Sequence, residues 1–435
     1  MLLRIEDTDV ERSRQHHAEQ IISSLRWLGV EWDEGPIYQS DRLLRYAARV
    51  AELVELGRAY RCYCTVEQLD AERAAVEAAG KQYRYSGRCR ALSDGGEPPR
   101  NEPHVIRFRV ETGPIEFHDL IRGNVHFEAE LIDDFVLLRS DGYPTYHLSV
   151  VVDDIDMDIT HVARGDDHLS NTPKHILLFR AFDSEVPVFA HLPLILGSDR
   201  KRLSKRSGAT SAEEYRDMGI VPAALFNFLL LLGWSPGGDR ETVSKAEAAN
   251  VFDLSDVNRA PAVFDPEKLL WMNGQYLSRM LPEEIWPHLV PFLGEQAAPG
   301  LEALRPMIVL NHTRARTLRD LAGLLQPFFT EDDRLEYEPE AVKKHGKSAD
   351  VAQRMRELHE TLSALAVFDV STTEEALRKL AELQGVSAGK YIHPLRLALT
   401  GRGASPPIFD VAAVLGREKS LARLQRFIER LPTLL

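Results

Sequence analysis

The stretch from Leu194 to Gly208 reads LILGSDRKRLSKRSG, a short apolar run that ends in glycine and opens into a basic loop. Five of the seven residues from Arg200 to Arg206 are lysine or arginine. Glycines at both ends of the loop let the backbone bend and approach a ligand closely. Because α/β proteins bind ligands at the carboxyl ends of their strands, this loop is placed to hold a polyphosphate. A solvated basic turn is the alternative, and the motifs elsewhere in the chain decide against it.

The composition of the 435-residue chain is that of a globular protein with about two to four domains. No run of 18 apolar residues occurs, and the acidic N-terminus is not a signal peptide, so we expect a cytoplasmic protein without a membrane segment. The net charge of −13 argues against indiscriminate coating of nucleic acid. Residues 389–435 nevertheless carry eight Lys/Arg and three Asp/Glu, a local balance of +5 that suits phosphate contacts.

Alternation of apolar and polar residues predicts a strand at Leu2–Glu6, followed by a helix that ends at Leu28. Further strands are predicted at Tyr146–Val152, Ile159–Ala163 and Val186–Leu196. Thr172 and Pro173 begin a helix between the last two strands, a spacing that predicts a parallel crossover. Beyond residue 210 the pattern is almost wholly helical, with amphipathic segments predicted at Ala223–Leu232, Pro282–Phe292, Ala303–Leu310, Val351–Val367, Glu374–Gln384 and Ser420–Leu431.

The segment between these α/β parts has the pattern of an α+β insertion. Short strands separated by turn residues are predicted at Val105–Val110, Ile115–Phe117, Gly123–Phe127 and Phe135–Leu138. We therefore expect a split α/β domain of the Rossmann type, followed by an all-α region. The predicted boundaries are 1–60 and 146–209 for its two parts, 61–145 for the insertion, 210–280 for a helical connection and 281–435 for the C-terminal domain.

All three cysteines, Cys62, Cys64 and Cys89, fall within 28 residues, which points to one shared site. Thiolates gathered this closely suit a tetrahedral Zn²⁺, which needs four ligands. Tyr85 or a solvent oxygen is the candidate for the fourth ligand, whereas His104 lies too far along a loop. The alternative is that the cysteines are simply small buried apolar residues.

Three charged residues lie at positions where an α/β protein binds ligands. Glu6 ends one predicted strand, Arg164 follows another, and Lys205 lies in the basic loop. Glu6 can receive an ammonium group, Arg164 can bind a carboxylate with two hydrogen bonds, and Lys205 can contact a phosphate. A site that binds an amino acid beside a nucleotide needs these three groups. Taken alone, the acidic cluster at Glu6 is more often a helix cap, and Tyr146 is equally typical of a core residue.

Four motifs in order carry a resemblance to a known family. They are RIEDTD (4–9), DGYPTYHL (141–148), RGDDHLSNTPKH (164–175) and RLSKR (202–206), with YIHPLR (391–396) near the carboxyl end. With these motifs the chain closely resembles the bacterial glutamate–tRNA ligases, which are class I aminoacyl-tRNA synthetases. The resemblance runs from Met1 to Leu435 and implies a Rossmann-type catalytic domain with an acceptor-stem insertion and an all-α anticodon-binding domain.

The resemblance also implies roles for individual residues. Arg202, Ser204, Lys205 and Arg206 match the family's catalytic Lys-Met-Ser-Lys-Ser-type loop, in which Lys205 contacts the ATP phosphates. Glutamate binding is implied for Glu6, Tyr146 and Arg164, with Arg164 facing the side-chain carboxylate. Besides Lys205, the ATP site is implied to include Asp167, His168, Leu194 and Ile195.

The family's zinc module has two cysteines, a tyrosine or histidine, and a third cysteine, so Cys62, Cys64, Tyr85 and Cys89 are the implied ligands. Ala91 stands where some members carry histidine. The implied reaction joins L-glutamate to the 3′ end of tRNA(Glu) through glutamyl-adenylate, with Mg·ATP as co-substrate and tRNA bound during the first step. We expect a monomer.

The family also places a strand and a His-Ile-Gly-His-like signature ahead of RIEDTD, and this sequence begins after that point. We expect an upstream start rather than a truncated gene, and weak stability and poor activity for a 435-residue chain. Three alternatives are a glutamine-specific relative with C-terminal β-barrels, a short queuosine-modifying paralogue without an anticodon domain, and a catalytically impaired tRNA-binding paralogue. The first two conflict with the helical pattern of about 150 residues after position 280.

Overall fold

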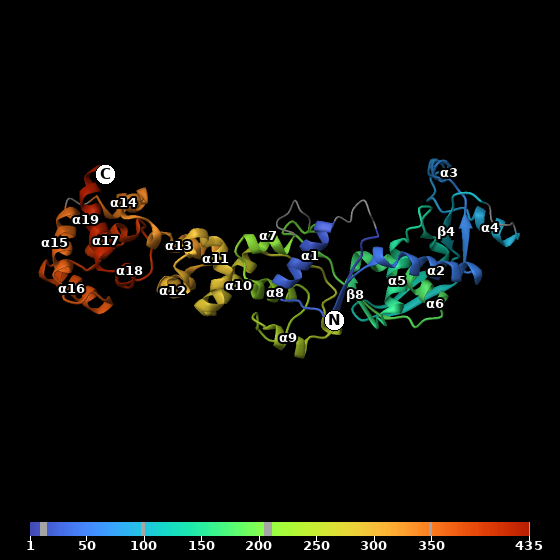
Figure 1. Ribbon diagram of the computed structural model, residues 1–435, viewed down its shortest axis with the longest axis horizontal. Coiled ribbons are helices and arrows are strands. Elements are labelled where there is room, and N and C mark those ends of the chain that lie inside the picture. Colours follow the sequence, from blue (N-terminus) through green and yellow to red (C-terminus); the bar gives the residue numbers. More distant parts are fainter. Residues whose placement is uncertain (9–14, 97–100, 204–210, 348–349, 435) are drawn as a thin grey trace. The chain divides into compact units, whose positions relative to one another are not determined.

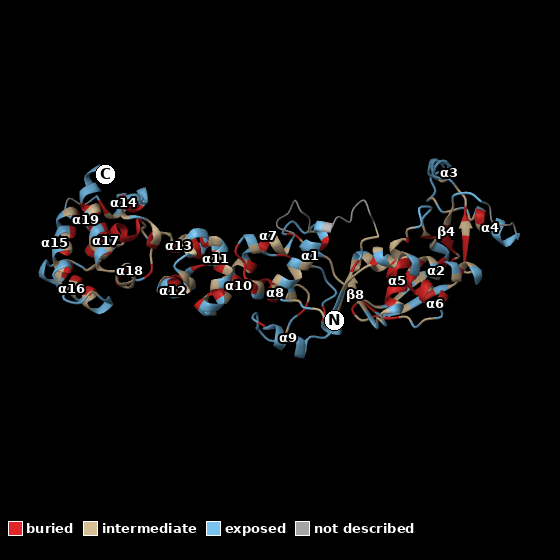
Figure 2. Ribbon diagram, in the orientation of Figure 1, coloured by how far each residue is buried: buried red, intermediate tan, exposed pale blue. Residues whose placement is uncertain are grey.

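The computed structural model describes residues 1–8, 15–96, 101–203, 211–347 and 350–434 (Figure 1). These residues form two compact units. The first unit consists of Met1–Glu213 and Phe226–Asp265, and the second of Glu214–Leu225 and Pro266–Leu435. In both units the buried residues gather where elements pack against one another (Figure 2).

The first unit contains both parallel and antiparallel strand pairs. Strand β1 (Leu2–Ile5) pairs in parallel with β2 (Glu34–Tyr38), and helix α1 (Gln15–Trp27) lies between them in the chain. A separate four-stranded sheet has the order β6-β5-β9-β8. Its parallel pair is β8 (His161–Gly165) and β9 (Val188–Leu192), joined by helix α6 (Thr172–Ala181) as a parallel crossover.

The hairpin of β5 (Pro114–Asp119) and β6 (Gly123–Glu128) completes this sheet, because β5 pairs in parallel with β9. The sheet therefore combines strands from the predicted insertion with strands from the predicted second half of the Rossmann domain. A separate three-stranded antiparallel sheet has the order β3-β4-β7. Its strands are β3 (Ala59–Cys62), β4 (Val105–Phe108) and β7 (Val136–Leu138).

The strand predicted at Tyr146–Val152 is wrong, because these residues open helix α5 (Tyr146–Asp156). The prediction failed because residues 148–154 are all buried, so no amphipathic periodicity marks the helix. Three successive valines also favour a strand by intrinsic propensity. The helix forms because α5 packs between α2 (Leu43–Glu55) and α6, which cover it on two sides.

The strand predicted at Val186–Leu196 is divided into β9 and β10 (Ile195–Leu196), with Pro193 between them. Proline has no N–H to donate to a strand ladder, so the pairing stops there. Strand β10 pairs instead with β11 (Ala262–Val263), a small exception to the helical pattern predicted beyond residue 210. The remaining elements of the first unit are η1 (Gln39–Arg42), α3 (Val66–Ala78), α4 (Arg88–Asp94), η2 (Ala129–Leu131), η3 (Asp166–Asn171), α9 (Lys245–Val251) and η5 (Leu254–Asp256).

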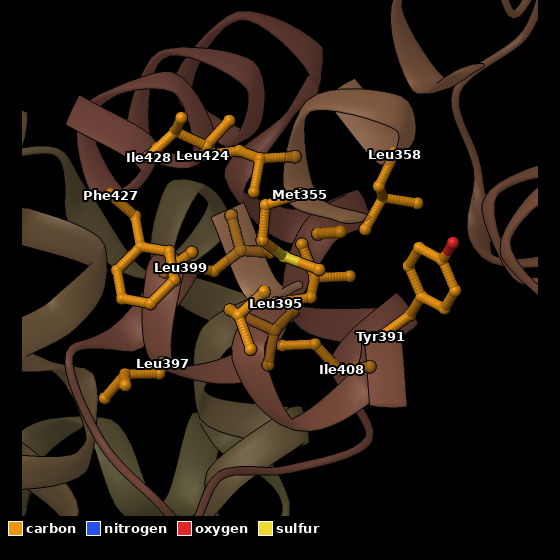
Figure 3. Packing of buried hydrophobic residues seen from close by; sticks show 14 of the residues in the cluster. Met355, Leu358, Tyr391, Leu395, Leu397, Leu399, Ile408, Leu424, Phe427 and Ile428 are labelled. Carbon is orange, nitrogen blue, oxygen red and sulfur yellow. The ribbon is translucent and has the colours of Figure 1, made fainter. Parts of the chain in front are cut away.

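The described part of the second unit is helical, as predicted. Its main core packs helices from the carboxyl-terminal part of the chain around Met355, Leu358, Tyr391 and Leu395 (Figure 3). Helices α7 (Ala212–Asp217) and α8 (Pro222–Leu230) lie where the chain passes between the units. The other helices are α10 (Pro266–Arg279), α11 (Pro282–Leu293), η6 (Gly294–Ala297), α12 (Gly300–Asn311), η7 (His312–Arg314), α13 (Leu318–Phe329), η8 (Asp332–Arg334), α14 (Pro339–His345), α15 (Val351–Ser363), α16 (Val370–Leu383), α17 (Gly389–Thr400), α18 (Ile408–Leu415) and α19 (Arg417–Leu434).

No helix in the described part of the chain is long and apolar enough to cross a membrane. The five predicted domain segments stay predictions, since the division into two compact units does not test them.

Candidate functional site

The site is organised around Arg164, which lies in β8 directly beside His191 of β9. Both residues stand near the carboxyl ends of parallel strands, where α/β sheets bind ligands. The Arg164 side chain donates hydrogen bonds through all three of its nitrogens. The acceptors are the Tyr146 hydroxyl (3.3 Å), the His168 carbonyl (3.3 Å), the Thr172 hydroxyl (2.8 Å), His175 Nδ1 (3.2 Å) and His191 Nε2 (3.3 Å).

Every one of these five partners is electrically neutral. No carboxylate within the described ranges forms an ion pair with Arg164, although the guanidinium is partly buried. Burial lowers the pKa of Arg164, while the Tyr146 hydroxyl and two more distant carboxylates oppose the shift. The site therefore presents a fixed positive charge that lacks a contacting anion.

Two histidines extend this polar cluster on the side of α5 and α6. Arginine can only donate, so Nδ1 of His175 accepts from Arg164 and the His175 proton resides on Nε2. That nitrogen lies 3.2 Å from Nδ1 of His147 and donates to it. Burial and the charges of Lys174 and Arg164 lower the pKa of His147 to about 4, and burial lowers the pKa of His175 well below its usual value. Both imidazoles are neutral at physiological pH.

Tyr146 is the first residue of helix α5 rather than of a strand. It nevertheless lies beside Arg164. Its ring centroid lies 5.5 Å from that of His175 and 5.9 Å from that of His168. Burial raises the pKa of the Tyr146 hydroxyl, which therefore remains protonated and can donate to a ligand. Tyr146 and Arg164 are brought together as the sequence predicts.

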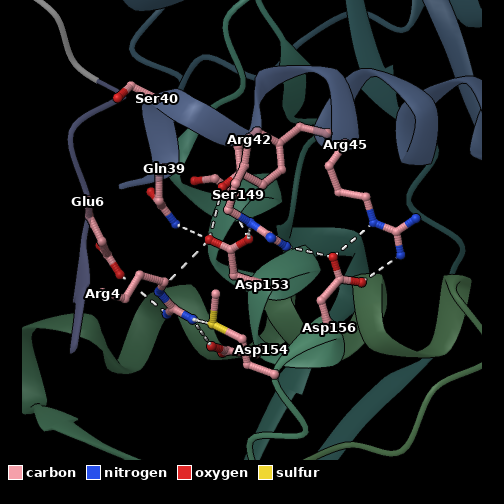
Figure 4. Close-up of polar contacts among 12 residues, drawn as sticks. Arg4, Glu6, Gln39, Ser40, Arg42, Arg45, Ser149, Asp153, Asp154 and Asp156 are labelled. Carbon is pink, nitrogen blue, oxygen red and sulfur yellow. Dashed lines mark hydrogen bonds and ion pairs between the residues drawn. The ribbon is translucent and has the colours of Figure 1, made fainter. Parts of the chain in front are cut away.

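Glu6 follows β1 and belongs to a second charged cluster (Figure 4). Arg4 Nη2 lies 3.5 Å from Glu6 Oε1, and Arg4 Nη1 donates to Asp154 at 2.8 Å. The Glu6 side chain is 43% exposed, so one carboxylate oxygen remains open to a ligand. Burial raises the pKa of Glu6, with Arg4 opposing that shift. The charge of Glu6 also acts on Arg164, where it opposes the lowering of the Arg164 pKa.

The Asp153 carboxylate fastens this cluster to α5. It accepts from Gln39 Nε2 (2.8 Å), Arg42 Nε (2.8 Å) and the Tyr46 hydroxyl (2.9 Å), and it is fully buried (Figure 4). The elements after β2 are thereby tied to α5, and α5 in turn holds Arg4 through Asp154. The strand predicted at Tyr146–Val152 ends just before Asp153 and Asp154, so the prediction missed their position in a helix.

The basic stretch forms a tight hairpin as far as it is described. Leu196 and Arg202 bridge in antiparallel fashion, and Leu203 N donates to Ile195 O at 3.0 Å. Arg202 Nη2 pairs with Asp167 Oδ2 at 2.6 Å, which joins the hairpin to the start of η3. Asp167 follows the β8 residue Arg164 by three positions. The predicted catalytic residues Ser204, Lys205 and Arg206 lie outside the described residues.

The other predicted nucleotide residues flank this ion pair. His168 Nδ1 lies 3.2 Å from Asn171 Nδ2, and its backbone carbonyl is bound by Arg164. Ile195 is 36% exposed and Leu194 is half-buried, so an apolar surface lies beside the Arg202–Asp167 pair. Apolar surface next to exposed cations suits a base attached to a polyphosphate.

The cysteine cluster is formed by β3 and the start of α4. The sulfur atoms of Cys62, Cys64 and Cys89 all lie within 4.8 Å of one another. The Tyr85 hydroxyl lies 3.3 Å from Cys62 Sγ and 3.9 Å from Cys64 Sγ. The Arg107 guanidinium stacks 4.1 Å from the centre of the Tyr85 ring. Three thiols and a hydroxyl are thus gathered beside a cation, an arrangement that fits a thiolate-bound metal.

Sequence reasoning missed Asp119, His191, His147 and His175. His147 and His175 stand inside the motifs at 141–148 and 164–175. The sequence therefore shows both residues but gives no sign that they contact each other. Asp119 and His191 lie 72 residues apart with no periodic signal, and only the β5–β9 pairing brings them together.

Comparison with known proteins agrees with this geometry. Residues 1–271 match the family described as tRNA synthetases class I (E and Q), catalytic domain, and residues 283–428 match the anticodon binding domain. The chain is 45% identical to glutamate–tRNA ligase 2 of Koribacter versatilis, over 98% of this chain and 90% of that protein. It is 43% identical to the glutamate–tRNA ligase of Legionella pneumophila strain Lens, over 99% and 91%.

A solved structure is also similar along nearly the whole chain. It is the glutamate tRNA ligase of Elizabethkingia meningosepticum in complex with its amino acid, with a TM-score of 0.87 at 34% identity. The match covers 99% of this chain and 92% of that one. The chain therefore belongs to the class I tRNA synthetases for glutamate and glutamine, with that family's catalytic domain followed by its helical anticodon-binding domain.

Proposed function

We propose that this chain is a glutamate–tRNA ligase, which activates L-glutamate with ATP and transfers it to the 3′ end of tRNA(Glu). The observation that carries the choice of amino acid is the partly buried Arg164 guanidinium, whose five contacts are all neutral. A carboxylate supplies the missing negative charge, whereas the amide of glutamine does not. Relatives named glutamate–tRNA ligase at 43–45% identity support the same assignment.

The glutamate site has one group for each charge of the substrate. Arg164 and the Tyr146 hydroxyl bind the side-chain carboxylate, and the open oxygen of Glu6 receives the α-ammonium group. The α-carboxylate is then free to attack the α-phosphate of ATP. These contacts hold the two reactants in place, which is the main contribution of a protein to such a transfer.

The ATP site lies on the hairpin side, as expected for a class I synthetase. His168, Leu194 and Ile195 line the adenosine, and Arg202 contacts phosphate by exchanging its Asp167 partner for the nucleotide. Lys205, together with Ser204 and Arg206, stabilises the charge that develops at the α-phosphate. Mg²⁺ enters with ATP and neutralises the phosphates that leave as pyrophosphate.

Cys62, Cys64, Tyr85 and Cys89 are proposed to hold one structural Zn²⁺. The fit is supported by the gathered sulfurs, by the adjacent hydroxyl and by Arg107, whose charge offsets that of three thiolates. When bound, zinc stabilises the fold of this segment and takes no part in the reaction. Metal analysis of purified protein tests the site: about one zinc per chain is expected, and loss of that zinc from Cys64→Ser but not from Cys62→Ser would contradict a shared site.

The tRNA spans several proposed segments. Residues 61–145 contact the acceptor stem, 210–280 the inner stem, and 281–435 the anticodon, which agrees with the matched anticodon-binding domain. The basic balance of residues 389–435 supplies phosphate contacts. We further propose a monomer that works in the cytoplasm, where tRNA is charged.

Aminoacylation of tRNA(Glu) with radiolabelled glutamate tests the proposal. We expect charging with glutamate, no charging with glutamine at equal concentration, and ATP–pyrophosphate exchange that requires tRNA. Binding of tRNA without exchange would instead identify a catalytically impaired tRNA-binding paralogue. Efficient charging with glutamine would overturn the role of Arg164.

A further inference from the structure

A buried carboxylate and a buried imidazole form a chain of hydrogen bonds that ends at Arg164. Asp119 ends β5 and His191 lies in β9, and both side chains are 0% exposed. Asp119 Oδ2 accepts a hydrogen bond from His191 Nδ1 at 2.6 Å. On the opposite edge of the ring, His191 Nε2 accepts from Arg164 Nε at 3.3 Å and from the Thr172 hydroxyl at 2.9 Å. The imidazole thus connects the carboxylate to the guanidinium.

The hydrogen bonds define one tautomer of His191. Arginine only donates, so Nε2 of His191 must carry a lone pair and the single ring proton must reside on Nδ1. Thr172 accepts from Arg164 Nη2 at 2.8 Å, so its own hydroxyl proton is available to His191 Nε2. Burial lowers the pKa of His191, and hydrogen bonds lower that of Asp119 although burial opposes this, so the pair is a neutral imidazole beside a carboxylate.

The orientation of Asp119 is also determined, by three backbone N–H groups. Oδ1 accepts from Ile121 N at 3.0 Å and from Arg122 N at 2.8 Å, and the His191 N–H is shared between Oδ1 at 3.2 Å and Oδ2 at 3.1 Å. Oδ2 also faces the His191 ring. A carboxylate held in this way accepts from Nδ1 in one geometry, which fixes both the ring plane and its proton.

We propose that Asp119 and His191 are positioning residues that set Arg164 for the glutamate side chain, by holding His191 as an acceptor toward the guanidinium. The inference rests on the proposed function, because it takes Arg164 as the contact to the side-chain carboxylate. A second link supports it: Arg122, in the same β5–β6 turn, pairs with Asp166 at 2.7 Å, two residues after Arg164. The turn therefore holds both Arg164, through His191, and the chain two residues after it.

Asp119→Asn tests the tautomer. The Ile121 and Arg122 N–H groups, which donate to Oδ1 alone, keep the amide oxygen at that position, so the NH₂ group replaces Oδ2 and faces His191 Nδ1. The ring must then accept at Nδ1 and carry its proton on Nε2, which turns it into a donor against Arg164. We expect the KM for glutamate to rise about tenfold or more, with the KM for ATP changed less than about twofold.

Two substitutions of His191 separate positioning from stability. His191→Asn places an amide near Nδ1, which keeps a donor for Asp119 but leaves Arg164 without its acceptor. His191→Gln places an amide oxygen near Nε2, which keeps the acceptor for Arg164 but leaves Asp119 without its donor. We expect the KM for glutamate to rise more in His191→Asn, and the Tm to fall more in His191→Gln. If the KM values follow the Tm values across the variants, the pair is merely structural and the proposal is overturned.

A direct readout does not depend on activity. The Nδ1 proton of His191 in the wild-type chain should give a far-downfield proton resonance, coupled to nitrogen in imidazole-labelled protein, and Asp119→Asn should remove it. Absence of that resonance from the wild type, or its persistence in the variant, overturns the proposal. Asp183→Asn, at an exposed residue with a positive φ of 51°, is the matched control and should leave both KM values unchanged. A wild type that shows the resonance but does not charge tRNA(Glu) refutes the proposed function instead.

Discussion

Arg164 in the first unit and Arg423 in the second are both arginines held by several hydrogen bonds, but their partners differ in charge. Arg423 is fully buried and donates to the Asp332 carboxylate at 2.6 Å, to Leu399 O at 2.6 Å and to Thr330 O at 2.7 Å. The contacts of Arg164 are hydroxyls, imidazoles and one carbonyl. The Arg423 guanidinium contacts a carboxylate, whereas Arg164 contacts none among the described residues and is acted on only by the more distant Asp154 and Glu6.

This difference separates a structural arginine from a binding one. A buried charge without a partner costs free energy, so a protein retains it only where a ligand or another function compensates that cost. Arg423 ties α19 to η8 and to the end of α17, and thus stabilises the second unit. Arg164 is oriented by neutral groups, and no carboxylate among the described residues contacts it.

Replacing Arg164 is the largest expected effect and the strongest test of the comparison. Arg164→Gln should lower kcat/KM for glutamate several hundredfold, about 3–4 kcal/mol, because the substrate carboxylate loses a charge-assisted partner in a partly buried site. The Tm should stay equal or rise, since an uncompensated charge is removed. Steady-state exchange assays and thermal unfolding measure both. A large fall in Tm with an unchanged KM for glutamate would place Arg164 with the structural arginines.

Replacing Arg423 should give the opposite pattern. Arg423→Met leaves two buried carbonyl groups and the Asp332 carboxylate without their donor, which should cost about 3 kcal/mol of unfolding free energy. Denaturant unfolding measures this loss. The KM for glutamate, determined at low temperature on the folded variant, should match that of the wild type. A raised KM with unchanged stability would break the distinction between the two arginines.

Acid sensitivity should also concentrate around Arg164, because its cluster contains neutral histidines. The pKa of His147 is about 4 in the folded chain and about 6.5 in the unfolded chain, so below pH 6.5 the unfolded chain binds more protons. The contribution of His147 to the free energy of unfolding is therefore fully present above pH 6.5. It is lost as the pH drops toward 4, which lowers that free energy by about 2–3 kcal/mol.

The matched variant for this prediction is His147→Asn, which keeps an acceptor for His175 but cannot titrate. Urea unfolding at pH 7, 6 and 5 should show a shallower loss of stability in the variant than in the wild type. Equal slopes would mean that His147 is protonated without cost in the folded chain.

Residues that share a motif were predictable, and residues joined only by the sheet were not. Arg164, Tyr146 and Glu6 were found because each stands in a quoted motif, and the cysteines because three rare residues lie close in sequence. Tyr146 was correctly placed beside Arg164 even though its element was wrong. The buried run of α5 carries no periodicity, so its helix depends on packing against α2 and α6.

Asp119 and His191 show the limit of reading the chain in order. Their contact depends on the pairing of β5 with β9, which joins a strand of the predicted insertion to one of the predicted Rossmann half. Sequence separation hides such pairs, because neither residue has a distinctive spacing to the other. The roles of Ser204, Lys205 and Arg206 stay predictions, since these residues lie outside the described ranges.

The smallest expected effect concerns Arg202. This arginine extends the comparison because it has a carboxylate partner, as Arg423 does, but is exposed to water. Its side chain is 66% exposed and pairs with Asp167, which is 31% exposed. Water screens such a pair, so Arg202→Ala should change the unfolding free energy by less than about 1 kcal/mol. The KM for ATP should rise about threefold to tenfold, because a phosphate contact is lost, while the KM for glutamate stays constant.

Asp167→Asn is the matched partner for this last test, because the same ion pair can be broken from either side. Loss of Arg202 removes a ligand for phosphate, whereas loss of the Asp167 charge frees Arg202 from its competitor. The two variants should therefore shift the KM for ATP in different directions. Arg202→Ala should raise it, and Asp167→Asn should lower it by a smaller amount. Equal increases would mean that the ion pair itself, rather than Arg202, is what the nucleotide requires, and that Arg202 belongs with Arg423.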